Sequence, residues 1–265
     1  MKRPFLLRIV FLVLILPGCT PEEPAKEPPF QLKEFFSGFA QSQLFYSFVA
    51  DYKPFTSLIE YKNGKVSRVT HKKTISDLEH SSGFGDIVLL DSYHEYSYEG
   101  NTVELIWKID SDKIIYTPIK VKLMLDSRGR VATRIAGKDT TSYYYSERGE
   151  LSKSITHGNG QIITRDFFYD TNDNLVRING LRETNRGFVY HIFEYFENYD
   201  TAINGFNGLG VIEGALIRSL SRNNFHQYSR STYDGNNFKI DSLRYRLAVK
   251  YDSKGYPIYQ DYYIK

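Results

Sequence analysis

Hydrophobic residues in this chain come in short runs that alternate with polar residues and end at turn-forming residues. One arrangement recurs. A run closes with an aromatic or aliphatic residue, Asp or Ser follows, Gly or Asp comes three positions later, and a second apolar run begins two residues on. Alternating runs joined by such a turn are typical of a β-hairpin. Good copies span residues 123–131, 143–151, 167–175 and 248–256, and weaker ones span 60–66 and 96–101.

The turn residues of each copy have a physical role. The side chains of Asp126 and Ser146 can bond to nearby backbone and begin a turn. Gly149 stands where the backbone needs a positive φ, and Asp173 takes that place in the third copy. Anchor residues at 125, 145, 169 and 195 are spaced by 20, 24 and 26 residues, which fits two strands and two turns per unit. We therefore predict a mainly β fold, a long twisted antiparallel meander of hairpins with one or two short helices packed on one face.

The second strand of each hairpin gives a less uniform pattern. Val131, Thr133 and Ile135 are expected on one face of the sheet, with residues 130, 132 and 134 on the other. The strands that start at Leu151 and Leu175 show no such clean alternation. The sequence therefore does not predict a single buried apolar face along the whole sheet.

Two stretches have helical rather than strand periodicity. Between residues 31 and 49, aromatic and aliphatic residues recur at roughly helical spacing, which predicts a helix lying on the sheet. A similar pattern runs over residues 207–220, where Gly205, Gly208 and Gly210 crowd the start. We interpret the second stretch as core cover for one sheet face, with a hydrophobic groove or lipid contact as the less favoured alternative.

The N-terminus has the pattern of an export signal. Lys2, Arg3 and Arg8 are basic, and the apolar core that follows is shorter than the roughly 20 residues of a membrane-spanning helix. Residues 20–30 are rich in Pro and Glu and read as an extended tether. The predicted organisation is a signal peptide over residues 1–18, a tether over 19–30 and a single β-meander domain over 31–265.

The run Leu16-Pro17-Gly18-Cys19 resembles the cleavage and lipidation box of bacterial lipoproteins. That resemblance implies an acylated Cys19 as the first mature residue and a lipid-anchored protein of the outer membrane. Two or more acyl chains hold a protein stably in a bilayer. Glu22 and Glu23 resemble a surface-export signal of Bacteroidota-type lipoproteins. A surface-facing and a periplasm-facing protein both remain open at this point.

The closing copy, Tyr251-Asp252-Ser253-Lys254-Gly255, resembles the tyrosine–aspartate repeat of Rhs-type proteins. Together with the lipidation box, the degenerate repeats resemble a Bacteroidota-type lipoprotein family of unknown function. The resemblance covers about residues 55–265 and implies a long twisted antiparallel sheet. It brings no catalytic residues with it.

Charge and cysteine content narrow the function classes. The chain has a net charge of +3, but residues 1–18 carry three basic and no acidic residues, so the remainder is neutral. A neutral chain has no global attraction to nucleic acid, and we expect none as a partner. Cys19 is the only cysteine, so disulfides within the chain are excluded.

Motifs for catalysis and metal binding are not apparent. No two of the six histidines have the spacing of a helical metal site, and no Gly-x-Ser-x-Gly elbow occurs. Residues 170–174 resemble the start of a calcium loop, but Leu175 and Leu181 stand where such a loop needs Gly and Glu. We therefore expect no catalytic residue, no metal and no cofactor.

Tyrosines are the remaining candidates for ligand contact, because each side chain has a flat apolar face and a polar hydroxyl group. Tyr96, Tyr98, Tyr143 and Tyr145 are candidate ligand contacts, although cross-strand aromatic packing is the favoured explanation for any one of them. The favoured hypothesis is a lipid-anchored, non-catalytic binding or interaction module for a glycan or an envelope protein. A structural envelope scaffold is the alternative, and a hydrolase of extracellular polymer is the least favoured.

Overall fold

The computed structural model describes residues 31–36, 56–72, 92–109, 119–212, 215–253, 255 and 257–261. The signal peptide, the tether and Cys19 lie outside these ranges. The chain divides into two units between Phe30 and Gln31, and only the second unit is described below.

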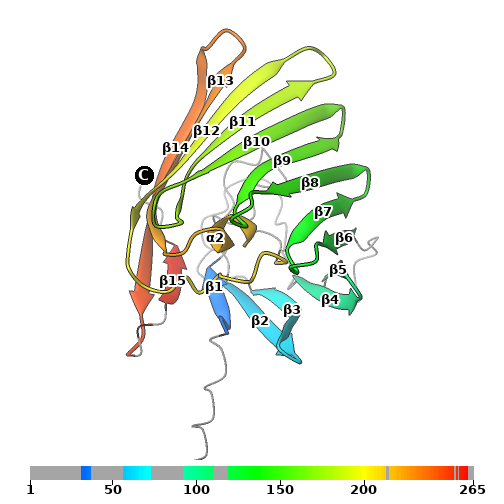
Figure 1. Cartoon of the computed structure of the whole chain (residues 1–265), viewed down its shortest axis with the longest axis vertical. Helices are drawn as coiled ribbons and strands as arrows, with labels where there is room; N and C mark the ends of the chain where they lie inside the picture. Colours follow the sequence, from blue (N-terminus) through cyan, green and yellow to red (C-terminus); the bar gives the residue numbers. More distant parts are fainter. Residues whose placement is uncertain are drawn as a thin grey trace, which may run out of the picture. The chain divides into compact units, whose positions relative to one another are not determined.

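The described part of the second unit is one antiparallel sheet with very little helix. Fifteen strands pair in sequence order, which confirms the predicted meander. The first and last strands are in contact, so the sheet curls until its two ends meet (Figure 1). The elements are β1 (Glu34–Phe36), β2 (Thr56–Lys62), β3 (Lys65–Lys72), β4 (Ser92–Glu99), β5 (Thr102–Ile109), β6 (Ile119–Leu125), β7 (Val131–Ala136), β8 (Asp139–Tyr145), β9 (Leu151–Gly158), β10 (Gln161–Tyr169), β11 (Leu175–Thr184), β12 (Val189–Tyr199), α2 (Leu216–Ser219), β13 (Phe225–Asp234), β14 (Lys239–Tyr251) and β15 (Pro257–Asp261).

The repeat turns have the geometry that their residues predict. Asp126 accepts hydrogen bonds on Oδ1 from the backbone N–H groups of Arg128 and Arg130, both at 2.9 Å. The turn of the third copy forms the same pair of bonds on Asp170. Gly149 has a φ of +91° and Asp173 a φ of +62°, as expected for the glycine place. The calcium-loop-like residues therefore form a hairpin turn.

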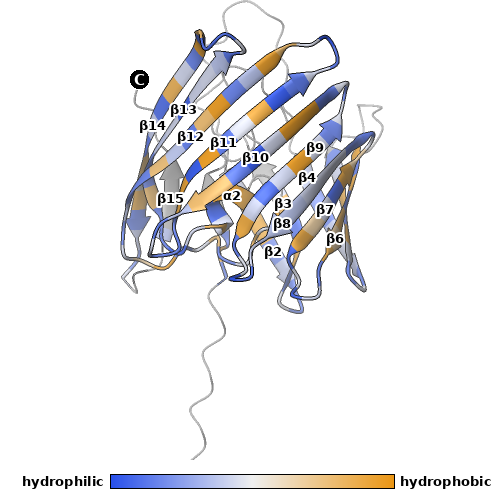
Figure 2. Ribbon diagram, turned by 45° about the horizontal axis from the view of Figure 1, so that its top comes forward, coloured by the Kyte–Doolittle hydropathy of each residue, from blue (hydrophilic) through white to orange (hydrophobic). Residues whose placement is uncertain are grey.

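A β-bulge follows these turns and corrects the predicted faces. The register shifts between Met124 and Leu125, which leaves Ala132 as an extra residue. Val131 and Arg134 are consequently the buried residues of β7, whereas Ile135 is only half-buried. The same shift occurs at the starts of β9 and β11. Period-two alternation fails there because each bulge moves the inward face by one residue. Figure 2 shows hydrophobic and hydrophilic residues interspersed along the strands.

Three tyrosines link successive hairpins on the inner face, and we call them the tyrosine ladder: Tyr145, Tyr169 and Tyr199. Each stands directly before the Asp or Ser of its turn, and its hydroxyl donates to the carbonyl of the first residue of an earlier strand. Tyr145 donates to Val131 at 2.7 Å and Tyr169 to Leu151 at 3.1 Å. Tyr199 makes the corresponding bond to the carbonyl of Leu175. The ladder ties each repeat to the one before it.

The connection between β12 and β13 folds against the inner face of the sheet, and we call residues 201–223 the plug, of which 213 and 214 lie outside the described part. It contains α2 and the buried side chains of Phe206, Ile212 and Leu216. The plug covers apolar residues as the sequence analysis predicts for residues 207–220.

Most of the predicted second helix is absent, because only residues 216–219 are helical. Gly208 has a φ of +80°, and the segment from 205 to 212 forms consecutive turns rather than a helix. The helix predicted over 31–49 is also wrong where the structure describes it. Residues 34–36 form β1, whose backbone pairs with β2, and residues 37–49 lie outside the described part.

Candidate functional site

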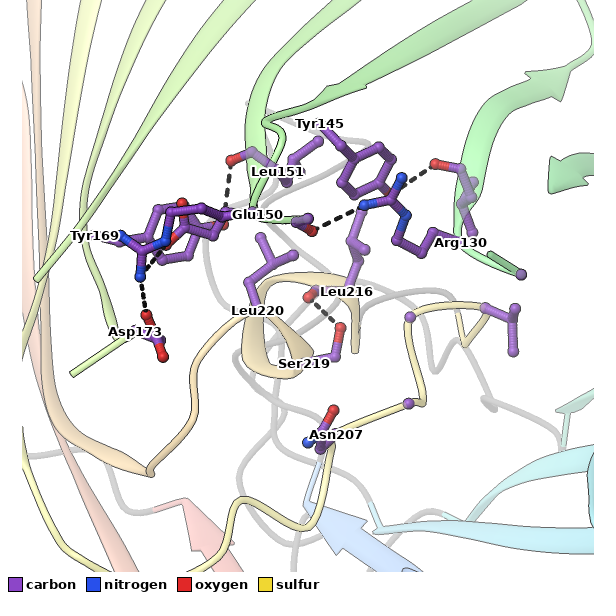
Figure 3. Close-up of a pocket in the computed structure, with 17 residues that line it drawn as sticks. Arg130, Tyr145, Glu150, Leu151, Tyr169, Asp173, Asn207, Leu216, Ser219 and Leu220 are labelled. Carbon is purple, nitrogen blue, oxygen red and sulfur yellow. Dashed lines mark hydrogen bonds and ion pairs between the residues drawn. The ribbon is translucent and has the colours of Figure 1, made fainter. Parts of the chain in front are cut away.

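A cavity of about 650 Å³ lies between the repeat turns and the plug, and we call it the turn cavity. Its size falls within the range of about 300–1,000 Å³ that is usual for small-ligand sites. One wall comes from the turns that follow β6, β8 and β10, and the other comes from the plug (Figure 3). The lining residues are Gly129, Arg130, Val131, Tyr145, Arg148, Gly149, Glu150, Leu151, Tyr169, Asp173, Asn207, Gly208, Gly210, Val211, Leu216, Ser219 and Leu220.

Arg130 is anchored in the turn wall by three side-chain hydrogen bonds. Its Nε and Nη2 donate to Asp126 Oδ2 at 2.8 and 2.6 Å, and its Nη1 donates to the carbonyl of Gly149 at 3.1 Å. The guanidinium also lies 4.0 Å from the centre of the Tyr145 ring, a cation–π contact. Such a fork of bonds to one carboxylate fixes the side chain. Arg130 therefore joins two neighbouring turns and shapes the cavity.

Titration of the neighbouring groups reflects this packing. Burial alone would raise the pKa of the Asp126 carboxyl, but hydrogen bonds from Arg130 and from backbone N–H groups outweigh it and lower the pKa. Burial raises the pKa of the Tyr145 and Tyr169 hydroxyls far above their ordinary value of about 10. Both phenols are therefore neutral hydrogen-bond donors across the physiological range.

A second charged group lies on the same wall and is more exposed. Arg148 Nη2 is 2.6 Å from Asp173 Oδ1 and 3.6 Å from Glu150 Oε1. The Arg148 side chain is 67% exposed, whereas that of Glu150 is 22% exposed. Glu150 Oε2 accepts from the Ser146 hydroxyl at 3.3 Å, but Glu150 Oε1 is buried and has no hydrogen-bond donor. The Arg148 guanidinium thus forms ion pairs with two carboxylates, those of Glu150 and Asp173.

The plug wall is mainly apolar. Leu216 and Leu220 come from α2 and its C-terminal end and face the charged wall in Figure 3. Ser219 also lines the cavity, but its hydroxyl donates to the carbonyl of Leu216 at 2.7 Å within the same turn. A Cβ added at Gly210 would come within 3.3 Å of Leu216 Cδ1, so the chain there packs closely. The cavity consequently has one polar and one apolar side.

Hydrogen bonds hold the plug against the turns. The backbone N–H of Asn223 donates to Asn174 Oδ1 at 2.9 Å, and the N–H of Leu175 donates to Ser221 Oγ at 3.1 Å. Asn204 is buried inside the plug, where its Nδ2 donates to the carbonyls of Arg218 and Ser221 at 2.6 and 2.8 Å. Both walls are therefore fixed relative to one another.

The four candidate tyrosines divide between the core and the cavity. Tyr96 and Tyr143 are each 8% exposed and belong to the hydrophobic core. Tyr98 packs against that core, and burial raises its pKa to about 12. Tyr145 alone of the four lines the turn cavity. Cross-strand packing accounts for the first three, so they do not converge on a site.

The proximity of Arg148, Glu150 and Asp173 was not predicted from the sequence. Each occupies a non-anchor position of a repeat turn, and the copies of the repeat align these positions in register. That alignment was the available signal. The plug residues of the cavity could not be placed in this way, because nothing in residues 207–220 indicates which turns they face.

Within the described residues, no group of three or more His, Cys, Asp or Glu side chains could hold a metal ion. No helix among them is long and apolar enough to span a membrane.

No protein-family model matches the chain, and no curated protein matches it. Among solved structures, the chain is similar to the crystal structure of a porin-like protein from Bacteroides vulgatus ATCC 8482, with a TM-score of 0.49 and 11% sequence identity over 85% of this chain and 88% of that chain.

Proposed function

We propose that this protein is a lipid-anchored component of the cell envelope whose sheet domain is a non-catalytic binding module. Its ligand is a glycan or an envelope protein, and its site is the turn cavity. The observation that carries the proposal is the cavity itself, about 650 Å³ in volume with one charged and one apolar wall. Concave sites of this kind suit a small ligand or the end of a chain, whereas protein partners usually meet over larger, flatter surfaces. The cavity therefore favours a glycan.

The rigidity of the walls supports a binding role. Arg130 and the tyrosine ladder tie neighbouring turns together, and Asn223 and Ser221 attach the plug to the third turn. A site whose side chains are held in advance loses less entropy when a ligand binds. The fold thus offers a preorganised cavity rather than a collapsed loop.

The charged lining supports a binding role. Glu150 and Asp173 are the two carboxylates of the cavity, and the same guanidinium of Arg148 lies beside both of them. Carboxylates and a guanidinium offer hydrogen-bond acceptors and donors to a polar ligand. This arrangement suits ligand contact.

The proposed anchor is the lipid on Cys19, and the outward face of the sheet is consistent with a domain in water. Ion pairs cross neighbouring strands there, for example Lys120 Nζ to Glu104 Oε1 at 3.4 Å and Lys153 Nζ to Asp166 Oδ1 at 3.9 Å. Charges of this kind are stable in water and costly in hydrocarbon. We place the protein at the outer membrane, held by its N-terminal lipid.

A glycan array with detergent-solubilised full-length protein tests the binding proposal. Asn207 is exposed and lines the cavity, so Asn207→Trp should block the site without entering the core. Asn172 is an equally exposed Asn in the third turn outside the lining, and Asn172→Trp is the matched control. We expect array signals that Asn207→Trp abolishes and Asn172→Trp keeps. Absence of any signal, or equal loss in both variants, would contradict the proposal and favour the scaffold role.

A further inference from the structure

Three neighbouring hairpin turns lie at the end of the sheet opposite the turn cavity, and we call them the distal tips. They are the turns between β9 and β10, between β11 and β12, and between β13 and β14 (Figure 1). The backbone N–H of Asn185 donates to the carbonyl of Gly160 at 2.7 Å, which joins the first tip to the second. The second and third are adjacent because the pairing of β12 with β13 extends to Tyr190 and Asp234. The distal tips therefore form one continuous rim.

The second and third distal tips repeat the turn of the cavity end with a different closing residue. Thr184 Oγ1 accepts from the backbone N–H of Phe188 at 3.1 Å, and Asp234 Oδ1 accepts from that of Phe238 at 2.9 Å. The same bond closes the turns at the cavity end, where the closing residue is polar, as at Arg130. Phe188 is 57% exposed and Phe238 is 71% exposed. Two of the three distal tips thus present an aromatic ring to the outside.

We propose that Phe188 and Phe238 insert into the surface layer of a lipid bilayer and orient the sheet domain on the membrane. Phenylalanine side chains of peripheral proteins enter the boundary between headgroups and acyl chains. A phenylalanine side chain has about 200 Å² of surface, so the two rings together expose about 250 Å². A stable protein interface covers about 800 Å² on each partner. The rings therefore match a shallow lipid contact better than a second copy of the chain or another protein.

The backbone of both tips suits a medium that is poorer in water. The N–H of Thr184 donates to the carbonyl of Phe188 at 2.9 Å, and the N–H of Asp234 donates to that of Phe238 at 3.0 Å. Together with the bonds from the two phenylalanine N–H groups, these bonds pair the closing residues within their own turns. Unpaired backbone groups are costly where water is scarce. The rings can therefore enter the boundary layer without carrying an unpaired N–H group with them.

The charges of these two tips are balanced, so the contact does not depend on anionic lipid. Three basic and three acidic residues lie within 182–189 and 233–241: Arg182, Arg186, Lys239, Glu183, Asp234 and Asp241. Arg186 and Lys239 are exposed near the rings. Long basic side chains can keep their charge among headgroups while their stems lie along apolar surface. The attraction to the membrane is therefore assigned to the phenylalanine rings.

The predicted anchor allows the distal tips to reach the membrane. The carbonyl of Leu32 accepts from the Tyr61 hydroxyl at 2.7 Å beside the turn between β2 and β3, so the chain enters the sheet at the cavity end. β11 has ten residues and is about 33 Å long. The predicted tether, residues 19–30, can span up to about 40 Å. A single acyl chain binds a membrane only marginally, and the two rings bury less. They therefore orient the domain, whereas the proposed lipid on Cys19 retains it.

Tryptophan fluorescence of the full-length protein in phosphatidylcholine vesicles tests this contact. Phe238→Trp places a reporter on a distal tip, and Asn172→Trp places one in an exposed turn at the cavity end. The wild type gives the background, because Trp107 is the only tryptophan. With lipids brominated on their acyl chains, we expect Phe238→Trp to lose fluorescence and Asn172→Trp to keep it. Phe188→Trp repeats the measurement on the neighbouring tip.

The possible results separate the tips from the anchor. Equal quenching in Phe238→Trp and Asn172→Trp, or quenching in neither, would overturn the inference. A blue shift of the Phe238→Trp emission that follows protein concentration in detergent, without lipid, would also overturn it and indicate that a second copy covers the tips. Protein that fails to float with the vesicles would contradict the proposed anchor and the tip contact together. Floating protein without quenching would contradict the tip contact alone.

Discussion

Asp200 and Asn224 are joined across the plug by the hydrogen bonds that close an ordinary repeat turn. The N–H of Asn224 donates to Asp200 Oδ1 and the N–H of Asp200 donates to the carbonyl of Asn224, both at 3.1 Å. Asp170 and Asn174 form the same pair of bonds, both at 2.9 Å, across a short turn. The plug is therefore an insertion into one turn of the hairpin repeat, and the residues that close the turn have been kept.

The closing role of Asp200 predicts a local effect on the plug. Asp200→Ala removes the acceptor for the backbone N–H groups of Asn224 and Ala202. Loss of about 1–2 kcal/mol of local stability should speed amide exchange in the plug by about 5–30-fold, with the strands β6 to β11 little changed. Hydrogen–deuterium exchange read by mass spectrometry checks this.

Asp234→Ala is the matched control for this experiment. Asp234 closes the turn between β13 and β14 through the N–H groups of Asn236 and Phe238, both at 2.9 Å, but no plug follows it. Exchange in the plug should be unaffected by this variant. Plug exchange that rises equally in both variants would show that Asp200 acts on the whole domain and does not close the plug.

The tyrosine ladder predicts that removal of a single tyrosine hydroxyl group lowers the stability of the domain. Tyr169→Phe removes the hydroxyl that donates to the carbonyl of Leu151 and leaves the ring in place. The free energy of unfolding should fall by about 1 kcal/mol, equivalent to a Tm lower by about 2–4 °C for a domain of this size. Tyr144 points outward and is 49% exposed, so Tyr144→Phe should leave the Tm unchanged. Equal behaviour of the two variants in thermal unfolding would rule out the ladder as a source of stability.

The turn geometry predicts that Gly149 does not tolerate a branched residue. Its φ of +91° is strained for any residue with a Cβ and most strained for Val. An added Cβ would also come within 3.3 Å of Arg130 Nη1, and the fork to Asp126 holds that guanidinium in place. Gly149→Val should cost at least about 1–2 kcal/mol, and Gly149→Asn should cost less. A Tm for Gly149→Val equal to that of the wild type would mean that the turn does not sit at these residues in solution.

Cys19 is the residue on which the proposed anchoring depends. Cys19→Ala removes the thiol to which the proposed lipid would be attached, and the variant should leave the membrane fraction when cells are lysed and centrifuged. The same fractionation of Asn207→Trp, which alters only the cavity, gives the control and should show full retention. Cys19→Ala protein that stays with the membranes would require another means of attachment.

The hairpin turns could be predicted because their hydrogen bonds join residues that are close in the sequence. The bulges and the contacts between distant residues could not. Asp126, Ser146 and Asp170 determine their turns through bonds to residues two to four positions away, so the turns follow from the sequence. The bulges after the turns do not, because the extra residue, such as Ala132, looks like any other strand residue. The faces predicted for Thr133, Arg134 and Ile135 were therefore wrong, and the burial of Arg134 was missed.

The plug shows the same limit on a larger scale. Its apolar residues predicted burial correctly, but helical spacing alone did not reveal that Gly208 turns the chain or that only four residues of α2 are helical. The bond between Asn223 and Asn174 spans 49 positions and has no local signature. The cavity depends on that contact, so its existence could not be predicted from the sequence.

Hydrogen–deuterium exchange of the full-length protein, with and without the glycan that gives the strongest array signal, tests the central claim most directly. If the turn cavity is the ligand site, the glycan should slow amide exchange in residues 146–150 and in the plug around residues 207–212. Exchange at the exposed turn between β13 and β14 should not change. Protection confined to that turn or to the outer face of the sheet, with none at the cavity, would contradict the account.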